Sequence, residues 1–410
     1  MINKSLSKKI LLLTYAFPPL QAPESFLSVK ALAKIQSYKV DILTIDASII
    51  DYARDESLEN YVINNFGKVF RAKPSRWINK RSFKMLRYVS FFPDRFRFFN
   101  SQIYNKALEI NVESYDLIIS WSQWHSIHLV ASKIKKKYPS LQWVSHFSDP
   151  WSDNPFLSRF LGYKASQFFF EKRVIKNSNA INFTTNLSRD LVMSKYPLSW
   201  MNKTYVTPHS YDSSLYKKNN SKKTKYVISY VGNFYGPRNP LTLLKSLSQI
   251  YQKDNDFFNE VVFRFIGKWF GNDDWNLKIN DLPEGLIEVK SPVTYVASLA
   301  EISNSDLLLV IDAPFTSSVF FPSKLVDYIG SGLPILAITP EGSCLNILKN
   351  IGGLHAFPDS IDSISDGIEY AINSLKNKSI KSPTIKEKER YSNEYVSKEF
   401  EIMFKQLTET

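Results

Sequence analysis

The stretch FFPSKLVDYIGSGLPILA, at residues 320–337, carries the clearest structural signal in the chain. Ser323 suits the start of a helix, where its hydroxyl can cap the first exposed amides, and Gly332 and Pro334 suit the end of that helix before an apolar strand. Exposed amides at the positive end of a helix bind anions, and Lys324 adds a full charge beside them. We therefore predict a site for a diphosphate at this helix start.

Asp327 follows Ser323 by four residues, about one helical turn. A carboxylate in that place could accept hydrogen bonds from ribose hydroxyls, as acidic residues do in other nucleotide sites. The alternative is an ordinary capped helix with a surface ion pair between its charges. The local chemistry does not decide between these two interpretations.

Short β-branched runs alternate with helical stretches on both sides of this segment, a pattern typical of parallel sheets wrapped by helices. The first series of expected strands lies at residues 10–14, 40–44, 117–120, 143–147, 181–185 and 205–207. The second series lies at residues 227–231, 262–266, 287–289, 307–311 and 334–338. We expect an α/β chain of two Rossmann-like, doubly wound domains facing a cleft, with ligands beyond the carboxyl ends of the strands.

The length of 410 residues also favours two domains, because one hydrophobic core rarely organises so long a chain. The polar segment KKNNSKKTK, at residues 217–225, has no apolar residue and suits an interdomain linker. We expect an N-terminal domain over residues 1–216 and a C-terminal domain over residues 226–385. Residues 386–410 should form an amphipathic helix that packs back toward the N-terminal domain.

The composition is that of a globular protein, with 44% hydrophobic and 22% charged residues. No apolar run approaches the roughly 18 residues that cross a bilayer. The apolar stretch at residues 10–13 is too short for a signal peptide, so we interpret it as the first strand of a cytosolic protein. Cys344 is the only cysteine, which excludes an internal disulfide and a cysteine-based zinc site. The five histidines show no metal-ligand spacing, so we expect no metal.

The formal charge of +13 is distributed unevenly, since residues 68–97 hold ten basic residues and one acid, Asp94. Aromatic residues alternate with these cations. Basic residues attract anionic lipid headgroups at about 1 kcal/mol each, and aromatic rings can bury in the interface. We expect a surface that faces a membrane or an acceptor substrate, made by Arg76, Trp77, Lys80, Arg81, Lys84 and Arg87.

Two other interpretations of residues 68–97 stay open. One is a solvated basic face around a locally buried aromatic cluster. The other is a site for single-stranded nucleic acid, which also combines cations with aromatic rings. No recognised nucleic-acid-binding motif accompanies the stretch, so we expect no nucleic acid partner.

Residues 320–337 resemble the donor-binding element of family-four retaining glycosyltransferases, in which an acidic residue begins a helix that runs on to Gly-x-Pro. Asp327, Gly332 and Pro334 fall at the matching offsets. The family usually carries a second acid eight residues earlier, which contacts the donor sugar, but this chain has Val319 there. The Pro-Ser-Lys ahead of the acid resembles a bacterial subgroup associated with surface polysaccharide assembly.

The sequence YVGNFYGPRNP, at residues 230–240, resembles the glycine loop that opens the donor domain in this family. Arg238 stands where a pyrophosphate-binding lysine is common, and Gly232 permits close approach of the backbone to a ligand. The resemblance implies a donor site made by Gly232, Arg238, Ser323, Lys324 and Asp327.

The N-terminal domain resembles the acceptor side of the same family. FPP at residues 17–19 resembles the loop after the first strand, although residues 22–24 replace the glycines expected next. Residues 116–151 resemble the acceptor motifs of the subgroup. Asp149 and His125 are the candidates to take the proton of the acceptor hydroxyl, since both are expected at strand ends facing the cleft. A polar residue near a strand end can also be a satisfied structural group.

The resemblance covers about residues 10–405 and implies a GT-B glycosyltransferase that retains anomeric configuration. We expect it to move a sugar from a nucleotide-diphosphate sugar to a lipid-linked or saccharide acceptor in bacterial surface polysaccharide synthesis, whether of O-antigen, capsule or exopolysaccharide. The helix end, Lys324 and Arg238 would stabilise the leaving diphosphate without a metal, and the donor would be the only cofactor-like ligand. The enzyme would work in the cytoplasm, peripherally associated with the inner face of the cytoplasmic membrane.

Two alternatives keep the same fold and change the activity. A catalytically silent scaffold in a polysaccharide assembly complex is suggested by Val319 and by Pro-His-Ser at residues 208–210, where the family usually has Pro-Asn-Gly. A nucleotide-sugar epimerase would convert the donor with no acceptor present.

Overall fold

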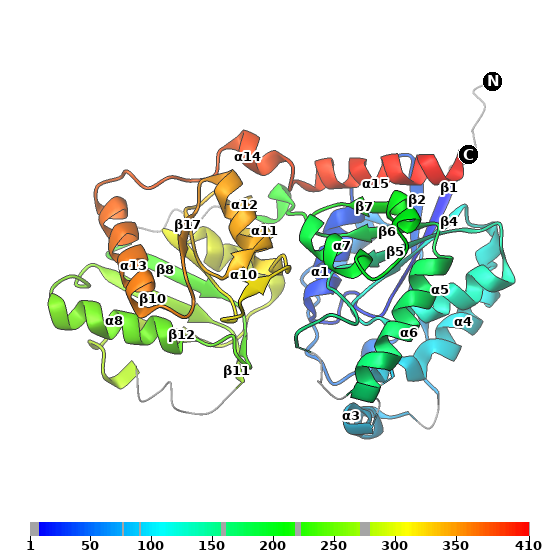
Figure 1. Cartoon of the computed structure of the whole chain (residues 1–410), viewed down its shortest axis with the longest axis horizontal. Coiled ribbons are helices and arrows are strands. Elements are labelled where there is room, and N and C mark those ends of the chain that lie inside the picture. The colour runs from blue at the N-terminus through cyan, green and yellow to red at the C-terminus, as the bar shows by residue number, and fades with distance from the viewer. Residues whose placement is uncertain are drawn as a thin grey trace. The chain divides into compact units, whose positions relative to one another are not determined.

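The first sheet has seven parallel strands in the order β3-β2-β1-β4-β5-β6-β7 (Figure 1). They are β1 (Lys8–Thr14), β2 (Tyr38–Ile45), β3 (Val69–Ala72), β4 (Leu117–Trp121), β5 (Gln142–Phe147), β6 (Ala180–Phe183) and β7 (Thr204–Val206). The chain winds outward from β1 to β3, returns, and winds outward again from β4 to β7. The winding therefore reverses between β1 and β4, which is where doubly wound sheets bind ligands.

The second sheet has six parallel strands in the order β12-β10-β8-β13-β15-β17 (Figure 1). They are β8 (Tyr226–Val231), β10 (Val261–Ile266), β12 (Ile287–Lys290), β13 (Leu307–Ile311), β15 (Ile335–Ile338) and β17 (Leu354–Ala356). Here the winding reverses between β8 and β13. The expected pair of Rossmann-like, doubly wound sheets is thus confirmed.

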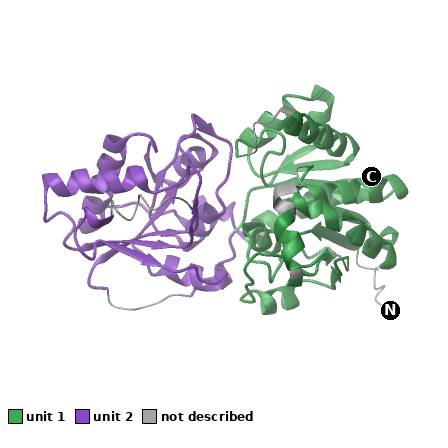
Figure 2. Cartoon of the chain, turned by 90° about the horizontal axis from the view of Figure 1, so that it is seen from below, with its two compact units in different colours: residues 1–210, 393–410 green, residues 211–392 purple. Residues whose placement is uncertain are grey.

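The protein is described by a computed structural model, which covers residues 8–75, 78–89, 92–156, 161–217, 223–270 and 279–409. Contacts divide the chain into unit 1, Met1–Ser210 with Asn393–Thr410, and unit 2, Tyr211–Ser392 (Figure 2). Unit 2 begins before the segment at residues 217–225 that suits a linker, because the Tyr211 amide donates to the Tyr391 carbonyl over 2.9 Å. Residues 218–222 of that segment lie outside the described residues.

Helices cover the two sheets. The described helices of unit 1 are α1 (Pro23–Leu32), α2 (Glu59–Asn65), α3 (Lys80–Val89), α4 (Asn100–Glu109), α5 (Ser126–Lys137), α6 (Leu161–Asn177), α7 (Asn186–Met193) and α15 (Asn393–Thr408). Those of unit 2 are α8 (Leu241–Lys253), α10 (Tyr295–Ser303), α11 (Ser323–Ser331), α12 (Ser343–Ile351), α13 (Ile361–Lys376) and α14 (Ile385–Glu389). Short strand pairs in unit 2 join β9 (Phe234–Tyr235) to β11 (Trp269–Phe270) and β14 (Ser317–Ser318) to β16 (Glu341–Gly342).

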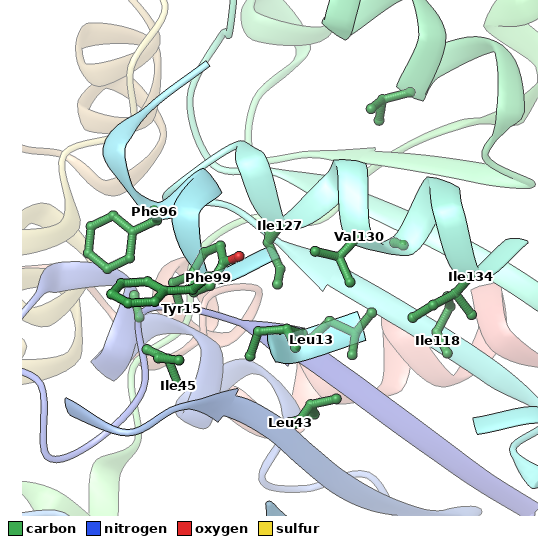
Figure 3. Packing of buried hydrophobic residues seen from close by; sticks show 14 of the residues in the cluster. Leu13, Tyr15, Leu43, Ile45, Phe96, Phe99, Ile118, Ile127, Val130 and Ile134 are labelled. Carbon is green, nitrogen blue, oxygen red and sulfur yellow. The ribbon is translucent and has the colours of Figure 1, made fainter. Parts of the chain in front are cut away.

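The main core of unit 1 lies between the sheet and α5 (Figure 3). Side chains alternate across a strand, so Leu13, Leu43 and Ile118 point to one face and are fully buried. They meet the apolar side of α5, formed by Ile127, Val130 and Ile134. Each such side chain contributes about 1.5–3 kcal/mol by burial, so this layer fixes the strands whose carboxyl ends carry polar residues.

Helix α15 packs on unit 1, as expected from its apolar spacing. The rings of Phe400 and Trp121 lie 5.7 Å apart, and the Ser397 hydroxyl donates to the Ala31 carbonyl over 2.9 Å. The expected single helix over residues 386–410 is wrong at its start. Residues up to Glu389 form the separate helix α14, and α15 begins at Asn393 because Ser392 pairs with Tyr211 in unit 2.

Besides the short strand pairs, two strands of the main sheets were not expected from the sequence. The strand β3 reads VFRA, which is short, only partly buried and placed inside the basic stretch. The strand β17 has three residues at the edge of its sheet. Neither has the apolar run that marks a central parallel strand.

Candidate functional site

Three strands of unit 2 end at one edge of the sheet, on both sides of the winding reversal. Gly232 directly follows β8, Asp312 follows β13, and Thr339 follows β15. Two cations join them, Lys324 from α11 and Arg238 from the loop after β9. The predicted donor residues Gly232, Arg238 and Lys324 are thus brought together at the edge where doubly wound sheets bind ligands.

Gly232 is required by the packing of this edge. Its φ is +155°, and a β-carbon there would lie 2.8 Å from the Lys324 Nζ. Gly267, directly after β10, is packed still more tightly, since a β-carbon on it would lie 2.2 Å from the Gly232 carbonyl oxygen. Glycine at both positions therefore lets the backbone and Lys324 meet closely.

Lys324 lies on the face of Tyr230. Its Nζ is 3.8 Å from the ring centroid and donates to the phenol oxygen. The phenol in turn donates to the Asn233 carbonyl over 3.0 Å. Burial, and then the nearby Arg238 charge, hold the pKa of Lys324 well below its usual range. An anion that replaces the lost hydration would favour the charged amine.

Arg238 is held by two partners. Its Nη2 donates to the Asp312 Oδ1 over 2.8 Å, and its Nη1 donates to the Tyr235 hydroxyl over 2.7 Å. The other Asp312 oxygen accepts from the Thr339 hydroxyl over 2.8 Å. The Arg238 Nε is buried and has no hydrogen-bond partner in the part of the chain that the structure describes.

The start of α11 differs from the expectation for Ser323. Pro322 occupies the cap position with ψ 127°, and Ser323 is the first helical residue, so the expected serine cap is wrong. No side chain caps this helix among the described residues. The Leu325 amide donates to the Pro322 carbonyl over 2.9 Å, so the amides that a ligand could bond are those of the residues before it, at the start of α11.

Asp327 lies in the second turn of α11 and is 8% exposed. Its Oδ1 accepts from the Tyr295 hydroxyl over 2.8 Å, and its carbonyl accepts from the Tyr216 hydroxyl over 2.8 Å. The side chain is thus tied to α10. Its role toward a ribose stays a prediction.

A second polar cluster lies at the winding reversal of unit 1, around Glu24 at the start of α1. The Glu24 Oε2 accepts from the Trp121 indole and from the Ser148 hydroxyl, each over 2.7 Å. Ser148 also contacts the His146 Nε2 at 3.2 Å, and the His146 Nδ1 meets the Asn182 amide at 2.8 Å. Burial raises the pKa of Glu24 to about 8.

The two predicted proton acceptors occupy different surroundings. The His125 ring stacks on Trp151, with centroids 4.7 Å apart and planes 6° apart, and burial lowers its pKa to about 3. Asp149 follows β5 by two residues and is half-buried. Its charge is one of the influences that raise the pKa of Glu24, after burial, so Asp149 lies on the same edge as Glu24.

The loop that carries Asp149 is anchored from α6. Glu171 is fully buried and accepts from the Ser152 amide over 2.8 Å, from the Tyr196 hydroxyl over 2.6 Å and from Lys195. The Trp151 indole donates to the Gln167 side chain. Buried, hydrogen-bonded carboxylates of this kind fix loop positions.

The basic stretch divides into a buried and an exposed part. Phe83, Phe96 and Phe99 are fully buried against one another, so the aromatic cluster belongs largely to the core. The exposed part on α3 consists of Lys80, Arg81, Lys84 and Met85. Arg76 and Trp77 lie outside the described residues, as does the Arg87 side chain. No helix in the described ranges is long and apolar enough to cross a membrane.

Unit 1 also has a cavity of about 310 Å³. It is lined by the loop after β1, by α2 and by β3, with Arg54 and Arg71 beside Glu56 and Glu59. Arg71 donates to the Pro18 carbonyl over 2.7 Å, which anchors the loop. Across the described residues, no group of three or more His, Cys, Asp or Glu side chains is placed to hold a metal ion.

Sequence reasoning missed Tyr230, Asp312 and Glu24. Tyr230 and Asp312 each lie within or directly after an apolar strand, a position that signals a site only when the sheet order is known. Glu24 replaces a glycine expected in the loop after the first strand, and that departure was its only signal.

No protein-family model matches the sequence, and no curated protein matches it. Solved structures do. Sucrose-phosphate synthase from Thermosynechococcus elongatus is 13% identical, with a TM-score of 0.68 over 98% of this chain and 99% of that one. Anabaena HepE in complex with UDP and glucose is 13% identical, with a TM-score of 0.69 over 97% of this chain and 100% of that one. A Listeria monocytogenes protein assigned as a UDP-N-acetylglucosamine 2-epimerase is 11% identical, with a TM-score of 0.58 over 98% and 97%.

These similarities span both units and nearly the whole of each compared chain. Identities this low establish the fold alone. The chain is therefore a protein of the GT-B fold, with two Rossmann-like domains.

Proposed function

We propose that the protein is a glycosyltransferase whose unit 2 binds a nucleotide-diphosphate sugar. The observation that carries this proposal is the convergence of Lys324, Arg238 and the uncapped start of α11 at the winding reversal of the sheet. Backbone amides beside two basic side chains suit a diphosphate, because charge-assisted hydrogen bonds to phosphate oxygens are stronger than hydrogen bonds between neutral groups. HepE, which has the same fold, is solved with UDP and glucose, so UDP is the first nucleotide to test.

In the proposed reaction, the bond between the anomeric carbon and the diphosphate breaks, and an acceptor oxygen forms a new bond to that carbon. Negative charge develops on the departing diphosphate. Lys324, Arg238 and the α11 amides would stabilise it from positions fixed before the reaction, which is the efficient form of electrostatic catalysis. We propose that transfer retains anomeric configuration and proceeds without a metal.

The proton of the acceptor hydroxyl would pass to a carboxylate at the unit 1 edge. A general base works best when its pKa lies near the working pH, and the pKa of Glu24, raised to about 8, meets that condition. Asp149 lies near it on the same edge. The pKa of His125, lowered to about 3 by burial, makes that ring too weak a base for the role.

The acceptor is proposed to be a lipid-linked or oligosaccharide substrate at an anionic membrane surface. The support is the exposed group Lys80, Arg81, Lys84 and Met85 on α3, which joins three cations to an apolar side chain. Such a helix face can lie on anionic headgroups. This would place the enzyme on the inner face of the cytoplasmic membrane, in the synthesis of a bacterial surface polysaccharide.

A nucleotide-sugar epimerase is a second candidate, because the Listeria protein has the same fold. It would convert a sugar nucleotide with no acceptor present. A catalytically silent scaffold is a third candidate. It is suggested by Val319, which stands where the resembled family carries an acid and whose carbonyl accepts from the Ser343 hydroxyl over 2.9 Å. It would bind no nucleotide or turn none over.

The test is a thermal-shift screen of UDP-, GDP-, ADP- and CMP-sugars on wild type and on Lys324→Ala. We expect one nucleotide class to stabilise the wild type and the variant to lose most of that shift. Lys349→Ala, on the exposed face of α12, is the matched control and should keep it. Absence of any shift in the wild type would refute the donor site. Conversion of the bound sugar nucleotide without an acceptor would favour the epimerase.

A further inference from the structure

We infer that Asp312 is a positioning residue for the donor diphosphate, acting through Arg238. The inference rests on the proposed function, since it assigns a role within the same site. Asp312 belongs to none of the motifs that suggested the site from the sequence. It stands directly after the central strand β13.

The Asp312 and Arg238 side chains form a buried ion pair. Their side chains are 4% and 12% exposed, and the Nη2 to Oδ1 distance is 2.8 Å. Asp312 cannot rotate away freely, because its Oδ2 accepts from the Thr339 hydroxyl over 2.8 Å at the end of β15. The carboxylate is therefore held in a fixed position between the ends of β13 and β15.

The fixed Asp312 carboxylate orients the plane of the Arg238 guanidinium. Asp312 takes one Nη group and the Tyr235 hydroxyl takes the other. The Nε hydrogen is left buried without a partner among the described residues. Leaving a buried donor without a hydrogen bond costs free energy. The charge of Arg238 also acts on Lys324, so the two side chains lie close to each other. An anion is the ligand that satisfies both.

The alternative is that Asp312 only offsets excess positive charge. The two interpretations predict opposite changes in the affinity for a diphosphate when Asp312 is replaced by Asn. A carboxylate near a phosphate repels it, so if charge alone matters, Asp312→Asn should tighten the binding of a diphosphate. If Asp312 positions Arg238, the same variant should weaken binding, although it removes a negative charge.

The experiment is calorimetric titration of the full chain with UDP and, separately, with inorganic pyrophosphate. The variants are Asp312→Asn, Arg238→Ala and the double variant, each checked for folding by its melting temperature. We expect each single variant to raise the Kd of UDP at least tenfold. The double variant should be within about twofold of Arg238→Ala, because Asp312 acts through that residue.

Two further variants guard against a folding defect. Thr339→Val removes the hydrogen bond to Oδ2 and the contact of the same hydroxyl with the Cys344 thiol, while Asp312 and Arg238 keep their side chains. We expect it to raise the Kd about threefold in the wild type and not at all in Arg238→Ala. Asp306→Asn lies at the other end of β13, where Asp306 pairs with Lys223 at 2.9 Å, and should leave the Kd within twofold.

The outcomes separate the two levels of the proposal. Wild type that binds UDP while Asp312→Asn binds it equally or more tightly would overturn the role of Asp312 and leave the donor site standing. Independent, multiplying losses in the double variant would overturn it as well. Wild type that binds neither UDP, pyrophosphate nor any other nucleoside diphosphate would refute the proposed function, and this inference with it.

Discussion

Lys324 and Tyr230 are in direct contact, with the lysine Nζ 3.8 Å from the centre of the tyrosine ring. The contact joins α11 to β8, the first strand of the second sheet. It shields the amine from water, and Asp312, the carboxylate that acts on the amine, is itself paired with Arg238. The binding of an anion would therefore favour protonation of Lys324. An ordinary surface lysine is already protonated before any anion binds.

The affinity for UDP should therefore depend on pH through Lys324. The groups that act on its charge are Tyr230, Arg238, Asp312 and Cys344. Burial keeps the pKa of Lys324 low in the free protein, and a bound diphosphate would raise it, so binding takes up a proton. Above about pH 8, where UDP is almost fully ionised, we expect the affinity to fall as the pH rises, by at most about tenfold per pH unit. Titration in buffers of different ionisation enthalpy measures the proton directly. The same dependence in Lys324→Ala would contradict the assignment.

Gly232→Ala should disturb the same contact from the backbone side. A β-carbon at this position meets the Lys324 Nζ at 2.8 Å, so the lysine must move. We expect the Kd of UDP to rise at least tenfold. Gly236→Ala is the matched control, since Gly236 also has a positive φ, +53°, but a β-carbon there meets nothing within 4 Å. That control should lose about 1 kcal/mol of stability and keep its affinity. Equal losses of affinity in both variants would point to general loop strain.

Most strands of the two main sheets and the helix α11 could be predicted because their signals are local. Central parallel strands are apolar runs, and α11 ends at a glycine with φ +71°, as its sequence indicates. The pairing of Arg238 with Asp312 could not be predicted, because 74 residues separate them and only the sheet order brings β13 beside β8. The prediction that Ser323 caps α11 was wrong because Pro322 occupies the cap position.

Glu24 should make the stability of unit 1 depend on pH. Its pKa is raised from 4.5 to about 8 by burial, so the folded protein favours the protonated carboxyl. This contribution is complete below pH 4.5 and is lost as pH rises through 8, with a slope of at most about 1.4 kcal/mol per pH unit. Glu24→Gln stays neutral and avoids that loss. Its free energy of unfolding in urea should therefore exceed that of wild type by more at pH 8 than at pH 5, and by a constant amount above pH 9.

The matched control for Glu24 is Glu113→Gln, which changes an exposed carboxylate of the same unit. Its difference from wild type should stay within about 0.5 kcal/mol at every pH. A Glu24→Gln difference that does not vary with pH would show that the carboxyl is ionised in the folded protein at neutral pH. Glu24 would then be too acidic for the role of proton acceptor.

The exposed cations of α3 should bind anionic lipid. Replacing Lys80, Arg81 and Lys84 with Ser removes three charges worth about 1 kcal/mol each near an anionic surface. We expect binding to vesicles with 30 mol% phosphatidylglycerol to weaken by roughly 100-fold in sedimentation assays, and the affinity for UDP to stay unchanged. The control replaces Lys133, Lys136 and Lys137, which are also exposed, on α5. A similar loss in both triple variants would mean that net charge, and not the α3 surface, attracts the protein to the membrane.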